Sequence, residues 1–216
     1  MSAELGLRER KKQQTRQAIV ETAHRLFAER GFDGVTVAQV ARAADVSEGT
    51  VFNYFPTKED LFYGGMEAFE AELVEAVRRR QPGESVLAAF RRFVLDRSVR
   101  LAAEETADLI TTAARIVTAS PALRAREREI VAQYTDSLGQ LIAEETRAGP
   151  EDVEPAAAAH ALMGVQRALV AYVRARVLSG ERGPELAANV RAQGKRAFAR
   201  LERGLAGYAV KRKPRS

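Results

Sequence analysis

The sequence predicts an all-α protein, and two observations support this fold class. Apolar residues recur at helical spacings along most of the chain, and no stretch alternates convincingly with the period of two that a strand would need. The seven prolines lie between these periodic stretches or at their starts, where a helix tolerates proline. A chain of 216 residues is long enough to bury a core in one large or two small domains.

The first predicted helix covers residues 15–29. Ile19, Ala23 and Leu26 lie on one helical stripe there, and Gly31 follows where a glycine commonly ends a helix. Residues 8–16, just before this helix, carry five cations against one acid. We expect them to form a basic arm that binds phosphate. Its site candidates are Arg10, Lys11, Lys12 and Arg16.

Residues 36–55 predict two short helices joined by a tight turn. Thr36 can cap the first helix and Ser47 the second, because each hydroxyl can accept a hydrogen bond from a backbone N–H of the first turn. Asp45 lies at the turn, where the residue must tolerate a left-handed backbone. The inward positions are Val37, Val40, Ala41, Ala44, Val51 and Phe55. Two short helices with a shared apolar side and a tight turn form a helix-turn-helix.

The outward side of the second helix favours nucleic acid as a partner. It carries Glu48, Gly49, Thr50, Phe52, Asn53 and Tyr54. Asn can pair with adenine through two hydrogen bonds, and Thr can bond a base edge or touch a thymine methyl group. Lys58 then opens a helix predicted over residues 58–79, whose free N–H groups and lysine could hold one phosphate. Gly64 and Gly65 lie inside this helical pattern, where they would permit tight packing or a bend.

The stretch from Thr36 to Leu61 resembles the DNA-binding signature of the TetR family of transcriptional regulators. It reads TVAQVARAADVSEGTVFNYFPTKEDL, and the resemblance covers about residues 12–65. The resemblance implies a homodimeric, ligand-responsive repressor with about nine helices, three of them in the DNA-binding part.

The resemblance also implies site residues, which are carried over by position. Base contacts would come from Glu48, Gly49, Thr50 and Asn53. Phosphate contacts would come from Thr36, Tyr54 and Lys58. Ser47 is a further DNA-binding candidate. Two positions depart from the family pattern, since Asp45 stands where glycine is usual and Phe52 where tyrosine is frequent. The second departure removes a possible bond from a hydroxyl to phosphate.

Beyond the break at residues 81–84 the sequence predicts five further helices. They cover residues 85–103, 107–119, 122–147, 155–178 and 185–208. The fourth of them is apolar on more than one face, so we expect neighbours on several sides, including a second subunit. The resemblance implies that the last two helices pair with their counterparts in a dimer, and the small residues Gly164, Ala168, Gly194 and Ala197 would permit this. The alternative is that these helices complete the core of a monomer.

Three parts follow from this organisation. We expect a DNA-binding domain with its basic arm over residues 1–56, a connecting helix over 57–80, and an effector-binding and dimerisation domain over 81–216.

An effector pocket needs an apolar cavity with a few convergent polar groups. The candidates are Thr111, Thr112, Arg115, Tyr134, His160, Gln166 and Tyr172. A histidine like His160 is more often a satisfied core residue than a ligand contact, and Arg115 is equally well explained as a paired surface charge. The many aliphatic residues favour a small lipophilic effector that could carry an anionic group.

Composition excludes several function classes. The chain has no cysteine and two histidines, which excludes zinc fingers, iron–sulfur sites and thiol nucleophiles and leaves little for a Ser-His-Asp triad. We therefore expect no metal, no cofactor and no enzymatic activity. No apolar run approaches the about 20 residues of a membrane span, and the N-terminus lacks the apolar core of a signal peptide. We expect a soluble, cytoplasmic protein without a membrane partner.

The net charge of +5 is unevenly placed. The tail over residues 211–216 is basic, and we interpret it as a solvated tail. Residues 1–60 hold nine basic and nine acidic residues, so their sum is 9 − 9 = 0. Affinity for phosphate must therefore come from where the cations lie. Two alternatives remain open: a small helical enzyme, and a protein that binds DNA without sequence preference.

Overall fold

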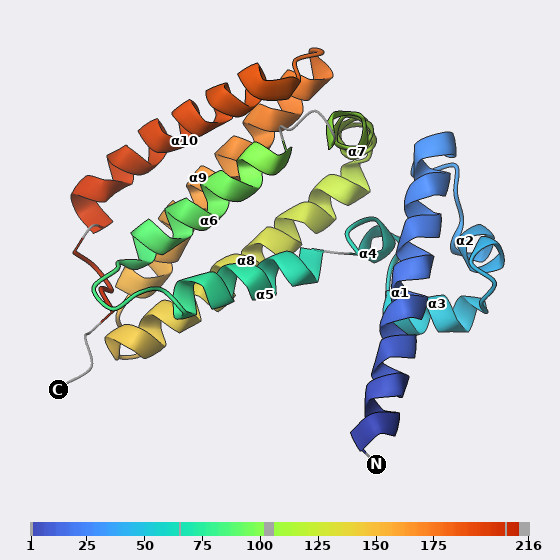
Figure 1. Ribbon diagram of the computed structural model, residues 1–216, viewed down its shortest axis with the longest axis horizontal. Coiled ribbons are helices and arrows are strands. Elements are labelled where there is room, and N and C mark those ends of the chain that lie inside the picture. The colour runs from blue at the N-terminus through green and yellow to red at the C-terminus, as the bar shows by residue number, and fades with distance from the viewer. Residues whose placement is uncertain (1, 65, 102–105, 206, 212–216) are drawn as a thin grey trace. The chain divides into compact units, whose positions relative to one another are not determined.

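The computed structural model of the protein confirms the all-α prediction (Figure 1). It describes residues 2–64, 66–101, 106–205 and 207–211, with side chains described from residue 10 onward except at 67 and 101. The basic tail over residues 212–216 lies outside these residues. The described residues form ten helices and no strand. The helices are α1 (Ser2–Arg30), α2 (Val37–Ala43), α3 (Glu48–Tyr54), α4 (Lys58–Phe62), α5 (Met66–Arg78), α6 (Val86–Leu101), α7 (Ala107–Ala119), α8 (Pro121–Thr146), α9 (Glu154–Leu178) and α10 (Gly183–Leu205).

The first helix is longer than predicted. α1 begins at Ser2, so residues 8–16 belong to the helix, and the prediction of a separate arm ahead of it is wrong. Residues 2–14 contain one glycine and no proline and are rich in Glu, Lys, Arg and Gln, which all favour helix. The helix therefore extends towards the N-terminus without needing an apolar stripe.

The helix predicted over residues 58–79 is divided in two. α4 ends at Phe62 and α5 begins at Met66, which raises the number of helices from nine to ten. Gly64 is buried in the interruption, and a Cβ there would lie 2.6 Å from Cγ2 of Val20 and 3.1 Å from the Phe55 ring. The expected close packing at Gly64 is confirmed, because a larger side chain would not fit.

The chain divides into two compact units. The first comprises residues 1–67 and 115–126, and the second comprises residues 68–114 and 127–216. The boundaries between the units therefore fall near the start of α5, within α7 and near the start of α8. Residues 57–67 and 115–126 form one compact unit with the helix-turn-helix. The functional boundaries at residues 56 and 80 stay a prediction.

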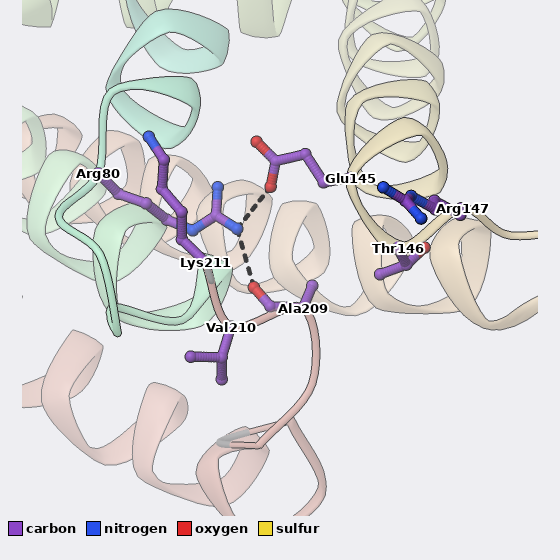
Figure 2. Close-up of a pocket in the computed structure, with 7 residues that line it drawn as sticks. All are labelled: Arg80, Glu145, Thr146, Arg147, Ala209, Val210 and Lys211. Carbon is purple, nitrogen blue, oxygen red and sulfur yellow. Dashed lines mark hydrogen bonds and ion pairs between the residues drawn. The ribbon is translucent and has the colours of Figure 1, made fainter. Parts of the chain in front are cut away.

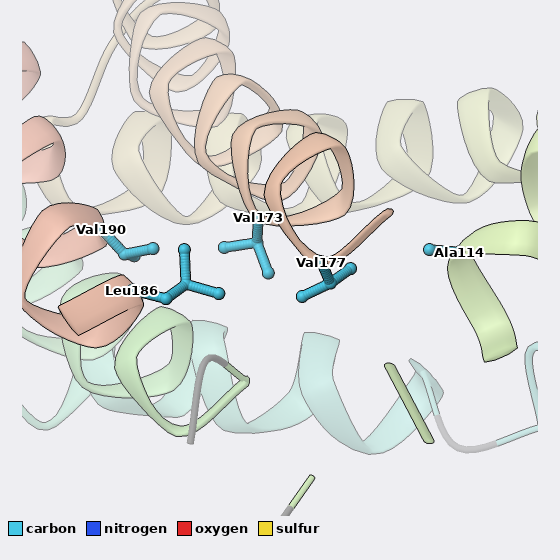
Figure 3. Close-up of a cluster of buried hydrophobic side chains, with 5 residues drawn as sticks. All are labelled: Ala114, Val173, Val177, Leu186 and Val190. Carbon is cyan, nitrogen blue, oxygen red and sulfur yellow. The ribbon is translucent and has the colours of Figure 1, made fainter. Parts of the chain in front are cut away.

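In the second unit, α6, α9 and α10 pack against one another (Figure 1). Gly194 of α10 is buried where a Cβ would collide with Leu95 of α6 and lie 3.2 Å from Leu169 of α9. The close approach expected at Gly194 is thus made within the chain. A cluster of Ala114, Val173, Val177, Leu186 and Val190 joins α7, α9 and α10 (Figure 3).

One helix of the described residues, α9, is long and apolar enough to cross a membrane by length and composition. Its most apolar window is 39% buried within the chain. A single helix of this kind is weak evidence for a span, because the core helix of a globular protein passes the same test.

Candidate DNA-binding interface

The helix-turn-helix has the caps and the turn that the sequence predicts. Oγ1 of Thr36 accepts a hydrogen bond from the Gln39 N–H at 3.2 Å, and Oγ of Ser47 accepts one from the Thr50 N–H at 3.0 Å. Asp45 has a φ of 54°, in the left-handed region. These local contacts fix where α2 and α3 begin and how sharply the chain turns between them.

The outward face of α3 is open to solvent. Glu48, Gly49 and Asn53 are exposed, whereas Val51 on the opposite side is fully buried. Thr50 is half-buried, and its hydroxyl lies 2.8 Å from the Ser47 hydroxyl, so it takes part in the cap. The result is a rigidly seated helix that presents polar groups on one side.

An aromatic ring interrupts this polar face. Phe52 keeps 47% of its surface exposed. It follows Val51, which is fully buried, and precedes Asn53, which is exposed. Tyr54 at the end of α3 is half-buried, with its ring 6.4 Å from that of Phe55. Exposed Phe52 is an apolar surface for which the chain itself provides little cover.

The cations of α1 fall into two groups. Arg10, Lys11 and Lys12 are exposed along the helix. Arg16 is half-buried, and its guanidinium lies 4.9 Å from the centre of the Phe55 ring. Arg16 therefore links α1 to the end of α3, while the three preceding cations face solvent.

Lys58 is engaged with the protein itself. Its Nζ donates to the carbonyls of Phe32 at 2.9 Å and Val35 at 3.0 Å. The same ammonium lies 4.1 Å from the centre of the Phe32 ring. Two of its three N–H groups are thus directed at backbone oxygens of the loop between α1 and α2.

Two contacts within the first unit could not be read from the sequence. Oδ1 of the Asp60 carboxylate accepts from Nε of Arg126 at 2.8 Å. The Tyr63 hydroxyl donates to the carbonyl of Leu123 at 3.0 Å. The partners are separated by 60 or more residues, so no local pattern signals them. These two hydrogen bonds join the start of α8 to α4 and to the residue that follows it.

The predicted effector residues do not converge in one described site. The hydroxyl of Thr111 donates to the Ala107 carbonyl within its own helix at 2.7 Å, and the ring of Tyr134 packs on Phe69 at 5.9 Å. Tyr172 is half-buried and packs on the cluster of Figure 3, and Thr112 is also half-buried.

Three further candidates have distinct surroundings. His160 is exposed, so the interpretation of it as a core histidine is wrong, and its Nδ1 lies 2.9 Å from the Ala156 carbonyl. Arg115 is exposed and belongs to the first unit. Oε1 of Gln166 is buried without a hydrogen-bond partner. Of the seven candidates, Gln166 therefore shows a polar atom that a ligand could satisfy.

Two cavities lie elsewhere in the second unit. One of about 410 Å³ is lined by Arg80, Glu145, Thr146, Arg147, Ala209, Val210 and Lys211 (Figure 2). Another of about 620 Å³ lies between the start of α9 and the end of α10, where burial raises the pKa of the Tyr208 hydroxyl. None of the seven predicted effector residues lines either cavity.

The cavity of Figure 2 is built around a buried arginine. The guanidinium of Arg80, which is 2% exposed, donates to the carbonyl of Ala209 at 2.8 Å and pairs with Glu145 at 2.5 Å. It also donates to the carbonyls of Val77 and Glu84. These acceptors surround the cation, so its role is to tie chain segments together. No group of three or more side chains that could hold a metal ion occurs within the described residues.

Two protein-family models match the chain. Residues 19–63 match the model described as bacterial regulatory proteins, tetR family, and residues 84–206 match the MftR C-terminal domain.

Similar proteins share these regions to different extents. The chain is 25% identical over 170 residues to MftR of Mycobacterium tuberculosis, which is named as a transcriptional regulator of mycofactocin biosynthesis, covering 76% of this chain and 80% of MftR. It is 34% identical over 84 residues to the HTH-type transcriptional regulator TcmR of Streptomyces glaucescens, covering 39% of this chain. The chain thus spans 37% of the length of TcmR.

A solved structure shares the fold. The transcriptional regulator FadR from Bacillus subtilis, in complex with stearoyl-CoA, superposes with a TM-score of 0.55 at 20% identity. The match covers 85% of this chain and 97% of FadR. Identity at this level shows a common arrangement of helices.

Proposed function

Since the chain belongs to the TetR family of transcriptional regulators, we propose that it represses transcription by binding operator DNA through α3. The observation that carries this proposal is the capped helix-turn-helix whose α3 buries Val51 and exposes Glu48, Gly49 and Asn53. A helix seated in this way can enter the major groove with its polar side towards the base edges.

The contacts divide by chemistry. Asn53 and Thr50, with Gly49 and Glu48 beside them, are the groups we propose to meet bases, with Ser47 at the start of the same helix. Thr36, Tyr54 and the exposed cations of α1 would meet phosphates, which position the protein without reading sequence. The cations then supply the affinity that the neutral sum of residues 1–60 would not.

Selection of bound duplexes from a random pool tests the proposal. We expect enrichment of an inverted repeat whose half-sites lie roughly 34–36 Å apart, or a multiple of that spacing. Replacing Asn53 by Ala should change the preferred base at one position of each half-site. Binding without sequence preference would favour the non-specific alternative, and no binding at moderate salt would contradict DNA binding altogether.

We propose that the operator-binding species is a homodimer joined through α9 and α10. Apolar residues on α9, all small except Leu178, are exposed at helical spacing, namely Ala157, Gly164, Ala168, Ala171, Ala175 and Leu178. A second copy of the chain that covers this apolar stripe would remove it from water, which favours association. Two recognition helices related by a twofold axis also fit an inverted repeat.

We propose a small lipophilic effector that releases the protein from DNA. The largely aliphatic core of the second unit supports a mainly apolar ligand, and the unpartnered Oε1 of Gln166 supports a hydrogen-bond donor on that ligand. The stearoyl-CoA bound by FadR makes acyl thioesters a reasonable first probe. A bound effector would shift the population towards a state that no longer fits the operator.

Thermal unfolding with fatty acids and acyl-CoA thioesters tests the effector. A ligand at about 100 times its Kd raises the stability of the native state by about 2.7 kcal/mol, which a rise in Tm would report. The same compound should lower operator affinity. Because we propose that the protein binds DNA, we also propose the bacterial cytoplasm as its location.

A further inference from the structure

Lys58 lies at an electrostatically unusual place. It is the first residue of α4, where the positive end of the helix dipole disfavours a cation. Its ammonium instead donates to the carbonyls of Phe32 and Val35, in the loop between α1 and α2. The position of Lys58 is therefore explained by the neighbouring loop and not by its own helix.

These contacts connect the two ends of the helix-turn-helix. α2 and α3 are joined at the Asp45 turn, whereas the start of α2 and the end of α3 are the two far ends of this segment of the chain. Lys58 follows shortly after the end of α3, and it holds the carbonyl of Val35, the residue directly before the α2 cap at Thr36. One side chain thus ties the segment that ends α3 to the segment that begins α2.

The loop that Lys58 holds is itself anchored. Phe32 is buried, with its ring 5.2 Å from that of Phe27. The cation lies over the Phe32 ring, which adds an attraction to the two hydrogen bonds. Moving the ammonium away from this position to a phosphate would break two charge-assisted hydrogen bonds and the contact with this ring. An exposed cation such as Lys12 has no comparable cost.

We infer that Lys58 is a positioning residue, which holds the helix-turn-helix closed so that α3 keeps its reading geometry, and that it does not serve as a phosphate contact. This inference rests on the proposed DNA binding, because positioning matters only if α3 reads an operator. It assigns Lys58 a role that the family resemblance alone does not imply.

The test compares two substitutions of the same kind. Lys58→Met keeps most of the apolar stem and removes the ammonium, and Lys12→Met does the same at an exposed site of α1. Operator affinity is measured over a range of salt concentrations. Loss of a phosphate contact lowers the slope of log affinity against log salt by about one unit, and we expect this for Lys12→Met. For Lys58→Met we expect a loss of affinity of about tenfold at every salt concentration, with the slope unchanged.

Hydrogen exchange of the free protein gives an independent reading. In the native protein the Val35 N–H bonds to Phe32 and the Thr36 N–H bonds to Gln39. Both amides should exchange faster in Lys58→Met, and amides of α9 should be unchanged. A slope that falls by about one unit with unchanged exchange at these amides would overturn the inference. So would unchanged operator affinity.

A second variant covers the case in which Lys58→Met does not fold. Phe32→Leu keeps an apolar side chain but removes the ring beneath the ammonium, at a buried residue that cannot touch DNA. Positioning predicts lower operator affinity with the slope unchanged, whereas a free phosphate-binding Lys58 predicts unchanged affinity. If the native protein selects no operator, the proposed function fails, but the exchange rates still report whether Lys58 holds the loop.

Discussion

Phe52 is the residue at which the outward face of α3 departs most from a polar helix. Nearly half of its surface is exposed among groups suited to hydrogen bonding. An aromatic ring in the major groove can make apolar contact with the methyl group of thymine. We therefore expect Phe52 to favour thymine at one position of the half-site.

Removing either partner of this contact tests it. Phe52→Ala should weaken operator binding by about 1 kcal/mol, as should replacing that thymine by deoxyuridine, which lacks the methyl group. The two losses should not add when combined, because each removes the same contact. Additive losses in binding titrations would show that Phe52 contacts something else. Asn53→Ala serves as the control, since its effect should add to that of the methyl deletion.

Asp45 carries the left-handed backbone of the turn between α2 and α3, with a φ of 54°. A side chain in this region is strained, and glycine relieves the strain at some cost in the entropy of the unfolded chain. We expect Asp45→Gly to raise the free energy of unfolding by about 0.5 kcal/mol and Asp45→Val to lower it by about 2 kcal/mol. Urea denaturation measures both. Equal stability of the two variants would mean that backbone strain is unimportant at this turn.

At the scale of elements, one carboxylate makes two contacts in the link between α5 and α6. Oε2 of Glu84 accepts from the Gln81 N–H at 3.0 Å, and Oε1 pairs with Arg92. Burial raises the pKa of this carboxyl, but the Arg92 and Gln81 hydrogen bonds outweigh burial and hold the pKa below its ordinary value of 4.5. The ionised form is therefore favoured by folding.

The lowered pKa gives a stability difference that depends on pH. Because the folded pKa is below the unfolded one, the contribution of Glu84 is fully present above pH 4.5 and is lost as pH falls through the folded pKa. Glu84→Gln should lower the free energy of unfolding by about 1 kcal/mol at neutral pH. The difference should shrink below pH 4.5. The exposed Glu144→Gln is the control and should show little effect at any pH. A difference that grows in acid would contradict this assignment.

At the scale of the whole molecule, the exposed small residues of α9 predict a dimer. Ala168→Glu would bury a charge in the interface without a partner, which a dimer tolerates poorly. We expect twice the chain mass for the native protein and a monomer for Ala168→Glu in sedimentation equilibrium, with operator affinity lost together with the dimer.

A matched substitution separates the interface from general effects of charge. Ala132 is an exposed alanine of α8, and Ala132→Glu should leave both mass and operator affinity unchanged. If Ala168→Glu remains a dimer, the interface lies on another surface. If the native protein is a monomer at operator-binding concentrations, the homodimer proposal fails.

Much of the helix-turn-helix was predictable because the sequence signals for it are local. The caps at Thr36 and Ser47, the left-handed Asp45 and the buried Val51 all depend on groups within a few residues of one another. The same locality explains the error at residues 8–16. Charge pattern identified a basic segment there but did not reveal that α1 extends through it.

The sequence by itself determined the all-α class, the helix-turn-helix and the polar face of α3, since periodicity and capping act within a turn of helix. Tertiary structure alone decided which cations face inward. Arg80 is buried while its neighbours Arg78 and Arg79 are exposed, and Lys58 reaches carbonyls 23 and 26 residues away. Charged side chains of the same type are equivalent in the sequence. They become different when folding brings distant backbone oxygens to one of them and leaves the others in water.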